Sequence, residues 1–581
     1  MICVSALDQR NLREPTPANS QDTFNANSLS FPNTHSAPMW KKHPKALSYL
    51  FFSEMWERFG YYLMIGIFTL YLKDVKTGYA MTEKESADLY GTYIALVFLT
   101  PFLGGLLGDR YLGYTKSIIL GGLMMSFGYC LMSVHNLSTL YVAMTLVILG
   151  NGFFKPNMST LLGNVYSVPE HLHQKDEGYN IFYMGINLGG FICNFISAAL
   201  YITYGWGYAF IAAGVGMLIG VIIYIIGLKH YRMFDVKKPV APGDMPFGKI
   251  VVLILVPSVI AGVLGWMIPG DWFGSDSTDA FIFACIPLFY FYGNIYAKAA
   301  KSEKKPIAVL LTIFVVVILF WAVFKQNGSA LNTWADRYTN REVDGTAQKV
   351  FDNLILAQKV TYQKDSVALY DDQFRLQKEN GVVLKEYNYP VYFKNVAPDK
   401  LPAEGEQLSL WATNLSQSIN PGWVIALTPV VISFFAWRRR KKKEPSTATK
   451  IAFGLLISAF SALVMVTAVY MGNNGSEKVS VLWLIGSYGV ITLGELLLSP
   501  MGLSIVSKLS PTRIASLMMG GWFVSTAIGN KLSGVLATMW DGYDQKSNYF
   551  LLNFVLLLVA ASLGFVLLRW WNRVMNENGI K

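Results

Sequence analysis

Glu54-Met55-Trp56-Glu57-Arg58-Phe59-Gly60-Tyr61-Tyr62 places three charges within an otherwise apolar stretch, residues 46–72. At about 1.5 Å per residue, a helix of this length can cross a bilayer. A charge at its centre costs about 2.5 to 3.5 kcal/mol on insertion scales, so it should face a partner or a watery cavity. Glu54, Glu57 and Arg58 share one helix face because their spacing is i, i+3, i+4. The stretch therefore predicts the start of a proton and substrate pathway.

The composition is that of a polytopic membrane protein. Of the 581 residues, 53% are hydrophobic and 15% are charged, whereas soluble domains contain about 25% charged residues. Fourteen apolar runs are candidate spans: 46–72, 89–107, 117–134, 140–154, 181–201, 206–228, 250–268, 281–296, 307–324, 423–437, 451–471, 481–498, 514–539 and 550–568. The predicted fold class is therefore an all-α polytopic membrane protein.

Basic residues gather in alternate loops, and this bias predicts the orientation. The loops on the opposite side are short and acidic or neutral, as in 271–279, with Lys73, Lys76 and Lys84 as exceptions. Both termini are expected to be cytoplasmic, in a multi-pass protein of the cell (inner) membrane. The net charge of +11 follows largely from this pattern, so no nucleic-acid partner is predicted. The expected cytoplasmic loops contain Lys41, Lys42, Lys45, Arg110, Lys116, 229–238, 298–305, 438–443, Lys508, Arg513, Arg569 and Arg573.

Two segments differ from the spans. Residues 1–38 are polar and lack an apolar core, so a disordered extension is expected, neither a signal peptide nor a packed element. Met39 precedes the basic sequence Trp40-Lys41-Lys42 and is a candidate translation start. Residues 333–419 are charged and polar, which predicts an extracytoplasmic insert between the ninth and tenth spans; 386–393 could form strands within it. The insert is either a cap on the outer mouth or a binding module.

A glycine-rich loop, Gly104-Gly105-Leu-Leu-Gly108-Asp109-Arg110-Tyr-Leu-Gly113-Tyr-Thr-Lys116, follows the second span. It resembles the loop signature of major facilitator transporters, on the expected side of the membrane. Further motifs stand in the fourth and fifth spans, Gly152-Phe-Phe-Lys155-Pro-Asn157 and Tyr179-Asn-Ile-Phe-Tyr-Met-Gly-Ile-Asn187-Leu-Gly189-Gly190-Phe191. Together with the 54–62 run, they resemble the proton-dependent oligopeptide transporter family.

The resemblance continues through the later spans and covers nearly all of them, but neither 1–38 nor 333–419. It extends over Asn420-Pro421, Gly494-Glu495-Leu-Leu-Leu-Ser-Pro500, Gly521-Trp522-Phe523 and Gly529-Asn530. It implies a major facilitator fold with two six-helix bundles, 46–228 and 307–324 with 423–568, and two extra helices in 250–296. A central site and rocking of the bundles are then expected. A monomer is expected.

The sequence contains no GxxxxGK[ST] run to hold ATP phosphates. An ion gradient is therefore the expected energy source, and no cofactor is predicted. The six histidines lie outside the span centres, so Glu54, Glu57 and Arg58 are predicted to couple protons. The plain alternative for Glu57 and Arg58 is a structural salt bridge.

A zwitterionic peptide needs opposite charges for both of its ends, because removing them from water is costly. For the ammonium we expect Glu495 and Asn420, helped by Asn187. For the carboxylate we expect Lys155, with the Tyr62 hydroxyl. Trp522 and Phe523 offer aromatic walls. The alternatives are snorkelling for Lys155, interhelical hydrogen bonding for the two asparagines, and core packing for Trp522 and Phe523.

Three positions depart from the commonest family pattern. Ile65 stands where an arginine is frequent, Phe98 where a tyrosine is frequent, and Lys325 where a ninth-span glutamate is usual. If Lys155 and Lys325 face one cavity, they favour an anion between them. We therefore expect binding of Lys325 to substrate and a preference for acidic peptides. The change also leaves the proton stoichiometry open.

The predicted function is a proton-coupled symporter of di- and tripeptides. One alternative is a carrier of nitrate or another small anion, which the two lysines favour and Glu495 opposes. A second is a non-transporting peptide receptor with the insert as its sensor. The spans offer no nucleophile and base pair or metal-ligand cluster, which argues against an enzyme.

Overall fold

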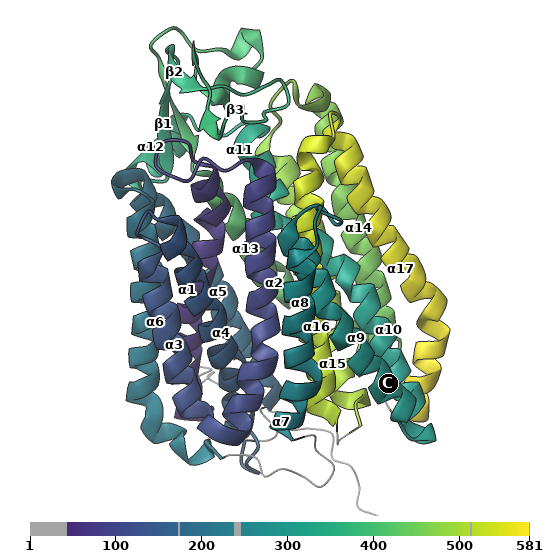
Figure 1. Ribbon diagram of the computed structural model, residues 1–581. Helices are drawn as coiled ribbons and strands as arrows, with labels where there is room; N and C mark the ends of the chain where they lie inside the picture. The colour runs from purple at the N-terminus through teal and green to yellow at the C-terminus, as the bar shows by residue number, and fades with distance from the viewer. Residues whose placement is uncertain (1–42, 172–174, 237–245, 512–513, 580–581) are drawn as a thin grey trace, which may run out of the picture. The chain divides into compact units, whose positions relative to one another are not determined.

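The computed structural model describes residues 43–171, 175–236, 246–511 and 514–579 (Figure 1). The predicted extension 1–38 and Met39 lie outside these residues. Each of the fourteen predicted spans coincides with a long helix: α1 (Lys45–Lys73), α2 (Glu83–Leu107), α3 (Tyr114–Leu131), α4 (Leu137–Val165), α5 (Lys175–Tyr204), α6 (Trp206–Gly227), α8 (Val256–Met267), α9 (Asp276–Lys298), α10 (Lys301–Phe324), α13 (Ile419–Arg440), α14 (Thr447–Met471), α15 (Val481–Leu509), α16 (Ala515–Thr538) and α17 (Lys546–Glu577). Before α8, the short α7 (Phe247–Ile250) and a π-helical turn, η6 (Val251–Leu255), extend the same span.

Within the described residues, eleven helical segments are long and apolar enough to cross a membrane. The three other helices on predicted spans are α1, α3 and α16. The charges Glu54, Glu57 and Arg58 lie in α1, and Lys531 lies in α16. The helical membrane fold is thus confirmed, while the full count of fourteen crossings stays a prediction.

The helices pack in two groups. In the first, α1 packs against α5 and α6, α3 against α4 and α6, and α2 against α4. In the second, α14 packs against α15 and α17, and α10 against α16 and α17. The groups meet where α2 packs against α16 and α5 against α13. Gly91 and Gly534 allow the α2–α16 contact, because a Cβ on either glycine would collide with the backbone of the other.

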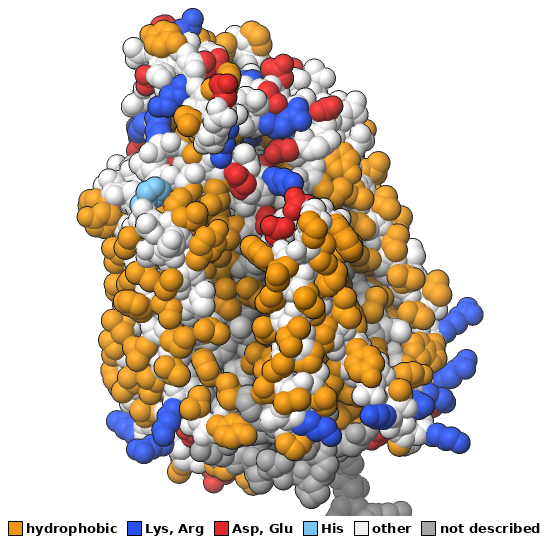
Figure 2. Space-filling view, in the orientation of Figure 1, with side chains coloured by type: hydrophobic (Ala, Val, Ile, Leu, Met, Phe, Trp, Pro, Cys, Tyr) orange, Lys and Arg blue, Asp and Glu red, His pale blue; other side chains and the backbone are white. Residues whose placement is uncertain are grey.

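The extra helices α8 and α9 pack against each other, and α9 also contacts α2 and α16. In Figure 1 this hairpin lies in front of α16, close to α2. Figure 2 shows an apolar belt around the helices on this face, with Lys and Arg side chains gathered at the end far from the insert. This distribution is typical of a protein surrounded by lipid.

The insert carries short helices and strands, so the all-α fold class holds for the spans, while the strands anticipated for this segment are present and more numerous than expected. It contains α11 (Ala330–Arg337), α12 (Gly345–Asn353) and three two-stranded antiparallel sheets, which pair β1 (Ala357–Thr361) with β6 (Gln407–Trp411), β2 (Asp365–Ala368) with β5 (Lys385–Asn388), and β3 (Lys378–Glu379) with β4 (Val382–Val383). In the first sheet Ala357 lies opposite Trp411.

The strand expected over 386–393 ends early. It stops at Asn388, and Val391–Asn395 forms a 3-10 turn. Pro390 precedes that turn, and proline cannot donate a hydrogen bond to a neighbouring strand. Figure 1 places the insert over one end of the helices.

Most of the glycine-rich sequence is helical: α2 runs to Leu107, a π-helical turn, η2 (Gly108–Leu112), follows it, and Gly113 separates η2 from α3. Gly113 has φ of +81°, which favours glycine. The Asp235 carboxylate accepts hydrogen bonds from the backbone N–H groups of Tyr114 and Thr115, at 2.7 and 3.1 Å. This contact holds the first turn of α3 because it satisfies two N–H groups that lack helical partners.

Candidate functional site

The charges of α1 form a buried ion pair. Glu57 and Arg58 are 0% and 3% exposed. Arg58 donates two hydrogen bonds to Glu57, from Nε to Oε2 and from Nη2 to Oε1, the second at 2.5 Å. Arg58 Nε also lies 3.5 Å from Glu54 Oε1. One guanidinium therefore serves two carboxylates, and protonation of either carboxylate would weaken its hold on Arg58.

Lys155 and Lys325 meet at Phe98. Lys155 belongs to α4, and Lys325 begins the 3-10 turn η7 (Lys325–Gly328) after α10. Their Nζ atoms lie 4.4 and 5.1 Å from the centroid of the Phe98 ring. The ring offers each ammonium the negative face of its π-system in place of a hydroxyl. Phe98 and Lys325, two of the three departures from the family pattern, are therefore neighbours in the structure.

The two lysines lie between the charges of α1 and Glu495 of α15. Lys155 lies within electrostatic range of Glu54 and Glu57. Lys325 lies within electrostatic range of Lys155 and of Glu495 on α15. Two ammonium groups, on α4 and η7, therefore lie between the carboxylates of α1 and the carboxylate of Glu495 on α15.

Glu495 is held by a neighbour from α13. Asn420 Nδ2 donates to Glu495 Oε2 at 3.2 Å and to Thr492 Oγ1 at 2.8 Å. Tyr62 lies within electrostatic range of both Glu495 and Arg58. Asn187 on α5 is only 8% exposed, and its amide donates to its own helix at the carbonyl of Tyr183, at 3.0 Å.

Five of these side chains remain partly exposed, although three of them stand well inside long helices, one directly follows α10 and one is the second residue of α13. Their polar groups are arranged with an acid and an amide at one end and two ammonium groups at the other. The members of this set, called here the charged cluster, are Tyr62, Lys155, Lys325, Asn420 and Glu495.

Trp522 lies elsewhere. It is 3% exposed in the core of the second helix group, and its ring centroid is 6.4 Å from that of Phe314. Phe523 packs against the same core. Ile65 is also buried, at 6% exposure, and offers no polar atom. The structure does not bring Trp522 together with the charged cluster.

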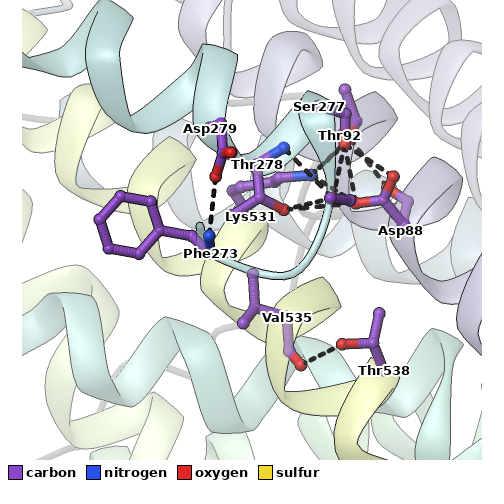
Figure 3. Close-up of polar contacts among 10 residues, drawn as sticks. Asp88, Thr92, Phe273, Ser277, Thr278, Asp279, Lys531, Val535 and Thr538 are labelled. Carbon is purple, nitrogen blue, oxygen red and sulfur yellow. Dashed lines mark hydrogen bonds and ion pairs between the residues drawn. The ribbon is translucent and has the colours of Figure 1, made fainter. Parts of the chain in front are cut away.

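A second ion pair, between Asp88 on α2 and Lys531 on α16, was missed by the sequence reasoning. Lys531 Nζ donates to Asp88 Oδ1 at 2.7 Å, to Thr92 Oγ1 at 2.7 Å and to Ser277 Oγ at 2.8 Å. Figure 3 shows Lys531 pointing among these three side chains. A lone lysine inside the run 514–539 was the available signal.

The extra hairpin takes part in this ion pair. Ser275 and Ser277 donate hydrogen bonds to Asp88 at 2.8 and 2.6 Å. Asp279 accepts from the backbone N–H of Trp272 and Phe273, at 3.0 and 2.8 Å, and so holds the loop before α9 in place. Asp88 therefore joins α2, α9 and α16 at one point.

The insert docks through charges on the ends of α1 and α2. Lys73 and Glu83 form an ion pair at 3.0 Å, and Thr333 Oγ1 donates to Glu83 at 2.8 Å. These residues line a cavity of about 30 Å³ together with Asp541, which follows α16. Burial, and then the nearby Glu83 charge, raise the pKa of Asp541 to about 6. The cavity is too small for a peptide.

Comparison with known proteins identifies relatives along most of the chain. A model of the POT family matches residues 115–351 and 412–551, so the unmatched middle falls within the insert. The chain is 28% identical to "Uncharacterized transporter YclF" of Bacillus subtilis, covering 90% of this chain and 93% of that one. It is 26% identical to a "Di-/tripeptide transporter" of Lactococcus lactis subsp. lactis, covering 86% and 90%.

Solved structures agree with this. The chain is similar to a peptide transporter POT crystallised in complex with sulfate, with 27% identity and a TM-score of 0.68. The match covers 92% of this chain and 95% of that chain.

Proposed function

The chain belongs to the POT family, and from this premise we propose that it is a proton-coupled symporter that imports di- and tripeptides by alternating access. Two of the similar proteins reported above are described as peptide transporters. The proposal includes fourteen membrane crossings in two six-helix bundles with an extra hairpin. It also includes cytoplasmic termini and a monomer in the cell membrane, with the insert outside.

The observation that carries the proposal is the separation of charge in the charged cluster, with the acid Glu495 at one end and the ammonium groups of Lys155 and Lys325 at the other. A peptide ammonium placed beside Glu495 and the Asn420 amide would put its carboxylate toward the lysines that flank Phe98. Each end of the zwitterion then meets an opposite charge, which offsets the cost of removing it from water.

Proton coupling is supported by the α1 ion pair. When Glu54 or Glu57 takes up a proton, the ion pair between that carboxyl group and Arg58 is weakened. The Arg58 guanidinium can then pair with another group. A change of charge at one place can thus bias a helix pair that has two stable arrangements. The roles of Glu54, Glu57 and Arg58 follow from this argument.

The experiment that tests the function is peptide accumulation in proteoliposomes under an imposed pH gradient. One proton moving down one pH unit supplies about 1.4 kcal/mol, so we expect about tenfold accumulation of a dipeptide. A membrane potential of 100 mV adds about 2.3 kcal/mol per charge moved. A protonophore should abolish accumulation. Nitrate uptake without peptide uptake would favour the anion carrier, and peptide binding without uptake would favour the receptor.

A preference for acidic peptides is proposed from the two ammonium groups at Phe98. In Lys325→Met, the advantage of an acidic over a basic dipeptide should fall about tenfold, which corresponds to about 1.4 kcal/mol. Uptake competition with acidic, neutral and basic dipeptides measures it. Lys349→Met, on the exposed surface of α12, should leave the order unchanged. Equal inhibition of the unsubstituted protein by acidic and basic peptides would contradict the preference.

The same position tests the proton stoichiometry. Lys325→Glu restores the acid usual in the family, so it should make uptake depend more steeply on pH if that acid carries a proton. An unchanged pH dependence would leave Glu54 and Glu57 as the carriers.

A further inference from the structure

Three tyrosines surround the α1 ion pair on its buried side. Tyr61, Tyr93 and Tyr129 come from α1, α2 and α3, and each is at most 1% exposed. The Tyr129 ring lies so close to α1 that a Cβ on Gly60 would approach it within 3.2 Å. The Arg58 guanidinium carbon lies 4.8 Å from the centroid of the Tyr61 ring.

None of these three hydroxyls has a hydrogen-bond partner among the described residues. Glu54 Oε2, on the same α1 face as Glu57, also lacks one. A buried hydroxyl without a partner is costly, and proteins normally satisfy such groups with internal water. Several unpaired groups in one place point to a shared water site.

The tyrosines also lie near the carboxylates that would take up protons. Tyr129 is within electrostatic range of Glu57 and Arg58, and Tyr93 is within range of Glu57 and both other tyrosines. The charged groups around Glu57 are Glu54 and Arg58 on α1 and Lys155 on α4. By contrast, Tyr62 and Lys155 are partly exposed and belong to the charged cluster.

We propose that Tyr61, Tyr93 and Tyr129 enclose an internal water site that delivers protons to Glu57, apart from the space that receives the peptide. The water accepts a proton from the solution side and passes a proton to the Glu57 carboxylate, so one proton moves and no bond to the tyrosines changes. The hydroxyls hold the water by hydrogen bonds and keep their own protons. The delivery role rests on the proposed proton coupling, while the water site does not.

Hydroxyl-radical labelling of the whole protein by synchrotron radiolysis tests the water site. Bound water beside a tyrosine should produce labelling of Tyr93 and Tyr129 despite their lack of exposure. Tyr292 is the comparator, because its buried hydroxyl donates to the carbonyl of Leu517 at 2.8 Å. Labelling of Tyr93 and Tyr129 no faster than that of Tyr292 would overturn the water site. Higher melting temperatures in Tyr93→Phe and Tyr129→Phe would do the same, because removing an unpaired hydroxyl from a dry site is stabilising.

Transport tests the delivery of protons. In Tyr93→Phe with Tyr129→Phe, pH-driven uptake should fall about tenfold, as expected when a proton transfer loses its support. Peptide counterflow, which needs no net proton movement, should be unchanged. Tyr224→Phe is the matched control, since Tyr224 is buried on α6 beside Tyr231. Equal pH-driven uptake in the double variant and the unsubstituted protein would overturn the delivery role. Absence of counterflow in the unsubstituted protein would overturn the proposed function and the delivery role with it, and labelling would still decide the water site.

Discussion

Replacing Arg58 with methionine should abolish pH-driven peptide uptake and strongly destabilise the protein. Glu57 is fully buried and accepts both of the hydrogen bonds that Arg58 donates to it. Removing one partner of a buried ion pair leaves an uncompensated charge, which costs about 3 to 5 kcal/mol. Denaturant or thermal unfolding in detergent measures the loss, and proteoliposome uptake measures the function.

A second substitution separates the two effects. In Arg58→Met with Glu57→Gln the unpaired charge is gone, so most of the stability should return while uptake remains absent. Arg440→Met, at the exposed end of α13, serves as the matched arginine control. If Arg58→Met unfolds like the unsubstituted protein, the pair does not stabilise the fold. If the double variant still accumulates peptide under a pH gradient, the pair does not couple protons.

The α1 site was predictable because its signal is local. Charges at i, i+3 and i+4 in an apolar run define one helix face whatever surrounds it. The same reasoning found Lys155, Lys325 and Glu495, since each is a single charge within or at the end of an apolar run. That Lys155 and Lys325 face one cavity was a hypothesis from a departure in the family pattern, and their shared contact with the Phe98 ring came only from the structure.

Other features depend on distant contacts. Asp88 falls just before the run 89–107, and its partner Lys531 lies 443 positions away, so no periodicity connects them. A tryptophan such as Trp522 can either line a cavity or pack in a core. The choice depends on its neighbours, and in the structure its contact with Phe314 places it in the core. In the insert, β1 pairs with the distant β6, which no short pattern could indicate.

Neutralising Asp88 should reveal how firmly α2, α9 and α16 are held together. In Asp88→Asn, the Lys531 ammonium, with a side chain only 3% exposed, loses its only acidic partner within ion-pairing distance among the described residues. We expect a loss of about 3 to 5 kcal/mol in unfolding free energy. Lys531→Met should cost less, because the Asp88 side chain is 23% exposed and keeps its hydrogen bonds from Ser275 and Ser277.

A double-mutant cycle completes this test, because it isolates the coupling between the two charges. Asp88→Asn with Lys531→Met should recover most of the loss seen in Asp88→Asn. Ser277→Ala is the uncharged control and should cost about 1 kcal/mol, the net value of a hydrogen bond. Additive single effects would contradict a coupled pair.

The consequence for transport follows from where the pair lies. Since α2 and α16 belong to different helix groups and touch at Gly91 and Gly534, the proposed rocking of the groups would break this contact. The double variant should therefore still carry peptide, but with the insert end open in a larger fraction of molecules, as spin-label distances across α2 and α16 would measure. An unchanged distance distribution would mean that the glycine contact alone, rather than the ion pair, keeps this end closed.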